Sequence, residues 1–73
     1  MQAKFSNYYK VISDNIKKLR LKDSLSQESF AEKVGCSREY ISRLENYHEH
    51  ASLDFMLNLA EIYKITPESF FKS

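Results

Sequence analysis

The sequence predicts an all-α fold, a compact domain of five short helices, and three observations lead to this fold class. Apolar residues recur at helical spacing in successive segments. Serine or threonine stands where several of these segments begin, as N-cap residues do. The 73 residues include one Gly and one Pro, so few residues interrupt the helices. We interpret residues 1–73 as a single domain in which residues 1–9 form an N-terminal extension.

The first helix is expected to follow the aromatic N-terminus. Ile12, Ile16 and Leu19 are spaced i, i+4 and i+7, which places them in one apolar stripe. Aromatic residues extend this stripe backwards, so the helix begins as early as Ser6. It should end near residues 23–24.

Two short helices separated by a tight turn are expected next. Ser26 and Ser37 are positioned as their N-caps, and Gly35 ends the first of them because glycine readily adopts the left-handed conformation. The apolar residues of the two helices are Phe30, Ala31, Val34, Ile41 and Leu44. A helix, a turn with glycine and a second helix between about residues 27 and 47 follow the order of a helix-turn-helix.

The last two helices are expected after a loop over residues 47–52. Thr66 as N-cap and Pro67 as first helical residue predict the start of a short fifth helix. The fourth helix has a predicted apolar face made of Leu53, Met56, Leu57, Ala60 and Tyr63.

Composition places the chain among ordinary globular domains, since 42% of its residues are hydrophobic and 29% are charged. The single Cys36 cannot form an intrachain disulfide. The N-terminal residues contain no long apolar run, so neither a signal peptide nor a membrane span is expected, and we interpret the protein as cytoplasmic.

Charge is distributed unevenly although the formal net charge is only +1. Residues 1–44 hold nine Lys/Arg and five Asp/Glu, whereas residues 45–73 hold two and five. A basic N-terminal part is expected if that part faces phosphates. A solvated charge gradient with no partner explains the same numbers equally well.

One sequence pattern is more specific than any of these. Ser-Gln-Glu-x-x-Ala-x-x-x-Gly spans residues 26–35, and it is followed by Ser37 and by Ile-Ser-x-x-Glu over residues 41–45. With the stretch 16–20 and the tail 52–71, this pattern resembles the XRE or phage-repressor-like (lambda repressor-like) helix-turn-helix family. The resemblance implies a transcription regulator of the repressor or controller type that binds double-stranded DNA, with a recognition helix at about residues 37–46 in the major groove.

The chain departs from the family pattern in three loops. The family often has glycine just after the third helix, proline before the serine of the fourth, and glycine after the fourth. This chain has Tyr47, Ala51 and Lys64 there.

The resemblance places the residues that read DNA at the start of the third helix. An Arg can contact guanine O6 and N7 together, and a Glu can accept from cytosine N4. Glu39 and Arg43 are also spaced i, i+4, so an ion pair between them is the alternative. Gln27 is assigned to a phosphate contact, and Ser37 contacts phosphate or only caps its helix. The candidate base-contacting residues are Arg38, Glu39, Ser42 and Arg43, with Tyr40 at the edge.

Two further contacts are expected. The resemblance implies that Arg20, late in the first helix, forms a partly buried ion pair with Glu45, late in the third. Small repressors usually dimerise, so we expect a homodimer through the fourth and fifth helices, where Phe55, Phe70 and Phe71 form an exposed apolar patch. The alternative surface is the aromatic N-terminus around Phe5, Tyr8 and Tyr9.

Other function classes fit the sequence less well. It shows no Ser/His/Asp arrangement and no phosphate-binding Gly-rich loop, so we expect no enzyme and no cofactor. His48, Glu49 and His50 lie in one loop with no Cys partner nearby, so no metal is expected. A protein-interaction module that keeps the fold without binding DNA remains the alternative, because the net charge is modest.

Overall fold

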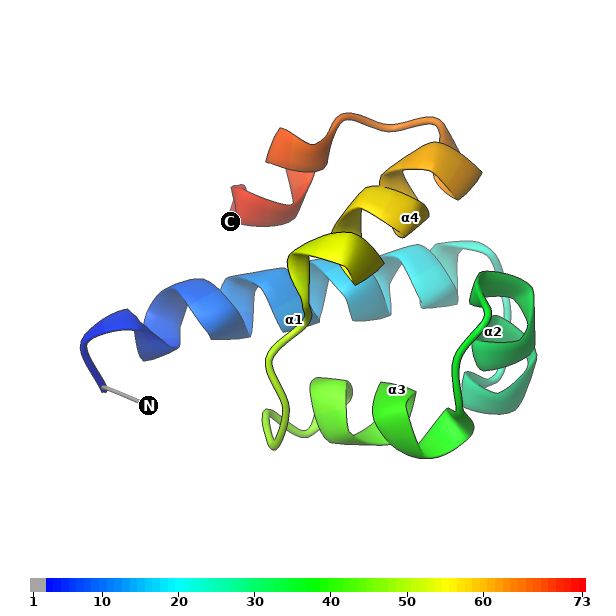
Figure 1. The fold of residues 1–73 in the computed structure, drawn as a ribbon, viewed down its shortest axis with the longest axis horizontal. Coiled ribbons are helices and arrows are strands. Elements are labelled where there is room, and N and C mark those ends of the chain that lie inside the picture. Colours follow the sequence, from blue (N-terminus) through cyan, green and yellow to red (C-terminus); the bar gives the residue numbers. More distant parts are fainter. Residues whose placement is uncertain (1–2) are drawn as a thin grey trace.

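The computed structural model describes residues 3–73 as helices joined by short loops (Figure 1). No strand occurs in that range, so the all-α prediction is confirmed. α1 begins at Ser6, as the apolar stripe indicates, so residues 6–9 belong to this helix. The elements are η1 (Ala3–Phe5), α1 (Ser6–Lys22), α2 (Gln27–Val34), α3 (Arg38–Glu45), α4 (Leu53–Tyr63) and η2 (Pro67–Phe71).

The caps expected from the sequence set the bounds of α2 and α3. Ser26 Oγ accepts the N–H of Ser29 at 3.0 Å, and Ser37 Oγ accepts the N–H of Tyr40 at 3.1 Å. Gly35 ends α2 with φ 84° and ψ 37°. Because glycine has no Cβ, it adopts this left-handed conformation without strain, and α3 starts three residues later.

One hydrophobic core joins all four α-helices and η2. α1 runs through the middle of the molecule, with α3 on one side of it and α4 and η2 on the other (Figure 1). Six large side chains are fully buried there: Ile16, Phe30, Ile41, Leu44, Leu59 and Phe70. None of the helices in residues 3–73 has both the length and the apolar character needed to cross a bilayer.

The predicted apolar face of α4 is confirmed only in part: Met56 and Ala60 are buried and Tyr63 packs against the core. Phe55 is buried and packs edge-on against the ring of Tyr40, with centroids 5.1 Å apart. Leu53 and Leu57 are instead 63% and 45% exposed. The core-facing side of α4 is thus centred away from Leu53 and Leu57 and includes Phe55. The core-facing residues of α4 are Phe55, Met56, Leu59 and Ala60.

The predicted fifth helix is a five-residue 3-10 helix, η2, rather than an α-helix. The side chain of Thr66 forms no capping hydrogen bond. The segment is held instead by Asn15 of α1, whose Nδ2 donates to the carbonyls of Phe70 and Lys72 at 2.8 Å each. Pulled against α1, η2 buries Phe70 and leaves Phe71 54% exposed.

These burials correct the expected apolar patch. Phe55 and Phe70 lie in the core and are not available to a partner, because α4 and η2 both turn them toward α1 and α3. Phe71 alone of the three remains on the surface.

Tyr47 and Lys64, which stand where the family often has glycine, adopt the backbone conformation that glycine favours. Tyr47 has φ 64° and Lys64 has φ 56°, both in the left-handed region. Lys64 ends α4 there, and its N–H donates to the carbonyl of Ala60. The loops therefore have ordinary shapes at these two positions, at the cost of local backbone strain.

Candidate nucleic-acid interface

α3 presents a polar face outward because its apolar face is fully inserted into the core. Ile41 and Leu44 are completely buried. Arg38, Glu39 and Arg43, on the other faces of the helix, are exposed. The side chains predicted to read bases are therefore accessible on a helix whose position is fixed by core packing.

The two arginines of this face are each paired with a carboxylate. Arg38 Nη2 lies 3.6 Å from Glu39 Oε2, and Arg43 Nε donates to Glu49 Oε1 at 3.2 Å. The i, i+4 pair of Glu39 with Arg43 is not among the ion pairs of the described residues, because Arg43 turns toward the loop that follows α3.

Two other predicted contact residues are engaged within the protein. Tyr40 is half-buried against Phe55, and its hydroxyl accepts the N–H of Ser52 at 3.4 Å. Ser42 receives the side-chain amide of Asn46, which lies 3.0 Å from its carbonyl and 3.4 Å from its hydroxyl. Tyr40 thus positions the start of α4, and Ser42 helps to end α3.

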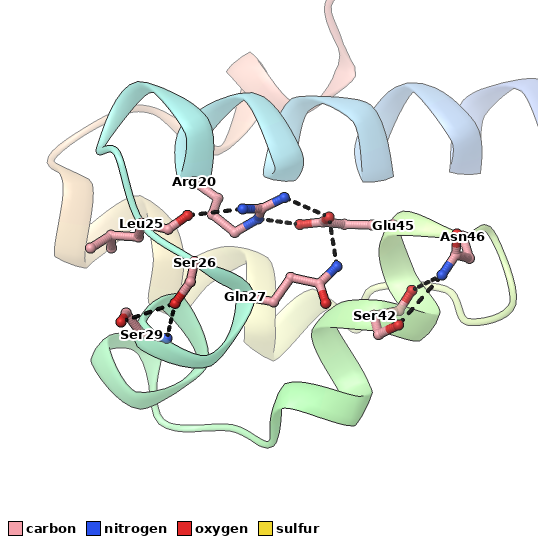
Figure 2. Close-up of polar contacts among 8 residues, drawn as sticks. All are labelled: Arg20, Leu25, Ser26, Gln27, Ser29, Ser42, Glu45 and Asn46. Carbon is pink, nitrogen blue, oxygen red and sulfur yellow. Dashed lines mark hydrogen bonds and ion pairs between the residues drawn. The ribbon is translucent and has the colours of Figure 1, made fainter.

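A carboxylate at the end of α3 joins three helices (Figure 2). Arg20 of α1 donates to Glu45 from Nε at 2.7 Å and from Nη2 at 2.9 Å. The same guanidinium donates from Nη1 to the carbonyl of Leu25 at 2.8 Å. The two charged side chains are only 11% and 5% exposed. This bidentate geometry fixes the far end of α3 against α1.

Gln27 completes this cluster. Its Nε2 donates to Glu45 Oε1 at 3.0 Å, so the first residue of α2 is tied to the last residue of α3 (Figure 2). The sequence assigned Gln27 to phosphate and missed this contact. Burial alone raises the pKa of the Glu45 carboxyl, but hydrogen bonds from Arg20 and Gln27, with the charges of Arg20 and Lys17, outweigh burial and lower that pKa below its ordinary value.

The loop after α3 is attached to the N-terminal turns of α1. The rings of Tyr9 and His50 are stacked with centroids 3.6 Å apart and an interplanar angle of 2°. The hydroxyl of Tyr47 donates to Asp14, and this bond raises the pKa of the Tyr47 hydroxyl. No pattern in the sequence predicts these contacts, since they join residues more than 30 positions apart.

A second polar cluster lies at the other end of α1. Lys33 Nζ contacts Asp23 Oδ2 at 2.6 Å, and the Tyr63 hydroxyl donates to the same oxygen at 2.8 Å. The bond from Lys33, followed by the bond from Tyr63, lowers the pKa of Asp23. The cluster links α2 and α4 to the end of α1 and has no part in the exposed face of α3.

Comparison with known proteins identifies the family to which this helical domain belongs. Residues 16–70 match the helix-turn-helix family that the sequence pattern resembles. The chain belongs to the XRE helix-turn-helix family. This is a family of DNA-binding transcription regulators, and the identification made from the motif at residues 26–45 is confirmed.

The XRE chain is also similar to a protein named as a regulator. It is 36% identical, over 50 residues, to the propionyl-CoA carboxylase regulator of Cereibacter sphaeroides. The aligned part is 68% of this chain and 11% of that protein, so the chain spans about a tenth of its relative's length. No solved structure matches the chain significantly.

Proposed function

We propose that this XRE-family chain is a sequence-specific regulator of the repressor or controller type, and that α3 enters the major groove of its operator. The observation that carries the proposal is the combination of accessible Arg38 and Arg43 with a helix held at both ends. The cap at Ser37 fixes the start of α3, and the Arg20–Glu45 pair fixes its end. A rigid helix of this size fits the major groove, where side chains distinguish base pairs.

The proposed contacts follow from chemistry and position. Arg38 and Arg43 would contact guanine edges, and Glu39 a cytosine amino group. Gln27 and Ser37 stand at the N-termini of α2 and α3, where backbone N–H groups favour phosphate. One hydrogen of the Gln27 amide is used by Glu45, and the amide group has a second to donate.

Two copies of the chain are proposed to bind a palindromic site together. Leu53 and Leu57 lie one helical turn apart on the exposed side of α4, and exposed Phe71 follows in η2. A second copy is the proposed occupant of this apolar surface, since one α3 covers one half-site and half-sites lie about 34 Å apart. Sedimentation equilibrium of Leu57→Glu tests this: it should be monomeric, while Leu21→Glu, at an exposed leucine of α1, stays dimeric.

The central experiment is selection of duplexes from a random pool, followed by binding measurements at several salt concentrations. Wild-type protein should enrich one sequence, with an affinity that falls steeply as salt rises, by a log–log slope of about 0.9 per neutralised phosphate. Arg38→Glu and Arg43→Glu should abolish or shift the enriched sequence, whereas Lys72→Glu, a reversal of the same size at the C-terminus, leaves it unchanged. If no duplex binds even at low salt, the interaction-module alternative replaces this proposal.

A further inference from the structure

We propose that Glu49 is a positioning residue that sets the base specificity of Arg43. Glu49 lies in the loop after α3, outside the helix-turn-helix itself. The inference rests on the proposed function, in which Arg43 contacts a base. It adds a second residue, with the opposite charge, to the readout of that base.

The contact geometry leaves the base-reading atoms of Arg43 available. Glu49 Oε1 takes the Nε hydrogen at 3.2 Å, and neither terminal nitrogen bonds another described residue. Guanine O6 and N7 can be contacted by those two terminal nitrogens together. Glu49 therefore restrains the guanidinium of Arg43 through Nε and leaves the two terminal nitrogens free to contact a base. Fewer side-chain rotations of Arg43 are then lost when it binds a guanine.

Glu49 is itself held in place. On one side the ring of His50 stacks on Tyr9, and on the other Tyr47 donates to Asp14, so both attachments lead to α1. The N–H of His48 donates to the carbonyl of Arg43 at 2.8 Å, which turns the loop back along α3. The carboxylate thus sits on a loop that is anchored on both sides of it.

The charge of Glu49 also weakens contacts that carry no sequence information. An arginine without a counter-ion is attracted to any phosphate, and such contacts supply most non-specific affinity. Paired with Glu49, Arg43 adds little net charge to the surface, so its attraction to phosphate is weakened. The pairing therefore favours the correct base over other sequences.

The test compares Glu49→Gln with Glu32→Gln, which removes the same charge from the exposed side of α2. Affinities are measured for the selected duplex, for that duplex with one guanine changed, and for an unrelated duplex. E49Q should lower the ratio of specific to unrelated affinity by about two- to fivefold, the range expected of an exposed ion pair whose side chains are 50% and 40% exposed. Its log–log salt slope on unrelated DNA should steepen by about 0.9, one further phosphate.

The Arg43→Ala background decides whether Glu49 acts through Arg43. There, adding E49Q should change neither the ratio nor the slope beyond the effect of E32Q. The inference is overturned if E49Q leaves the ratio unchanged, if E32Q lowers it equally, or if the effect persists without Arg43. Thermal unfolding of each variant confirms that this exposed substitution leaves the fold intact. Absence of wild-type binding to every duplex refutes the proposed function instead.

Discussion

Removal of the Glu45 carboxylate tests how α3 is held. Glu45→Ala deletes two hydrogen bonds from Arg20 and one from Gln27, and it leaves a guanidinium that is 11% exposed without its counter-ion. Breaking one side of a buried ion pair costs about 3–5 kcal/mol. Because Arg20 keeps its hydrogen bond to the Leu25 carbonyl, we expect Glu45→Ala to lower the free energy of unfolding by about 3 kcal/mol, the lower end of this range. A domain of this size has a total stability of about 4–11 kcal/mol, so the loss is large.

The measurement is urea unfolding followed by circular dichroism, with the free energy extrapolated to water. Glu45→Gln keeps an acceptor oxygen and should lose about 1–2 kcal/mol. The double variant R20M/E45M replaces both charges with apolar side chains and should lie within about 1 kcal/mol of wild type. A loss below about 0.5 kcal/mol in E45A, or strict additivity of Arg20→Met and Glu45→Met, would refute the coupling between Arg20 and Glu45.

Acid titration checks the same contact with the wild-type protein. Because the folded-state pKa of Glu45 is lowered, its contribution to stability is fully present above the ordinary glutamate pKa of about 4.3. It is lost as pH falls through the lower folded-state pKa. Wild-type unfolding free energy should therefore drop in acid, and E45Q should drop less steeply. The unfolding free energy of E45Q should still fall somewhat in acid, because the folded-state pKa of Asp23 is lowered too.

Three further substitutions test the backbone and caps, each read by urea unfolding unless stated. Gly35→Ala should lower the free energy of unfolding by about 1–2 kcal/mol through left-handed backbone strain alone, since a Cβ at Gly35 meets nothing within 4 Å. Gly35→Asn should lower it less, because asparagine tolerates the left-handed conformation better. Lys64→Gly should gain up to about 1 kcal/mol by removing strain at φ 56°, and a loss would contradict that conformation. Asn15→Ala should speed amide hydrogen exchange in η2 while α2 and α3 stay protected, because three carbonyls of the last turn lose their donor.

Features set by local chemistry were predictable from the sequence. The caps at Ser26 and Ser37 and the turn at Gly35 depend on residues within a few positions of each other, so short patterns determine them. The helix-turn-helix order followed from these three signals. The Arg20–Glu45 contact was implied by the family resemblance and lies where the resemblance placed it.

The orientation of α4 was not predictable in the same way. Apolar residues occupy most of its positions, Phe55 through Leu57 in succession, so periodicity cannot select one face. The choice is made by tertiary packing, in which the Phe55 ring fits against Tyr40. η2 depends likewise on Asn15, which is more than 50 residues away in the chain.

The partner of Arg43 was missed for a related reason. Spacing on a helix suggested Glu39, but a left-handed residue at Tyr47 reverses the chain and brings Glu49 to the guanidinium. A tyrosine at φ 64° carries no sequence signature of such a turn, because glycine is the residue usually associated with it. Contacts of this loop are therefore visible only in three dimensions.

Two groups of residues are distinguished by the structure: those that hold α3 in place and those that are exposed on or beside it. Glu45 and Ser37 fix the two ends of α3 by contacts within the protein, so their loss should lower stability and affinity together. Arg38, Arg43 and Glu49 are exposed and contribute little to the core, so their loss should change affinity or specificity at nearly constant stability. A plot of binding free energy against unfolding free energy for these variants should therefore show two groups. A single line through all of them would mean that the exposed residues act on DNA only through the fold.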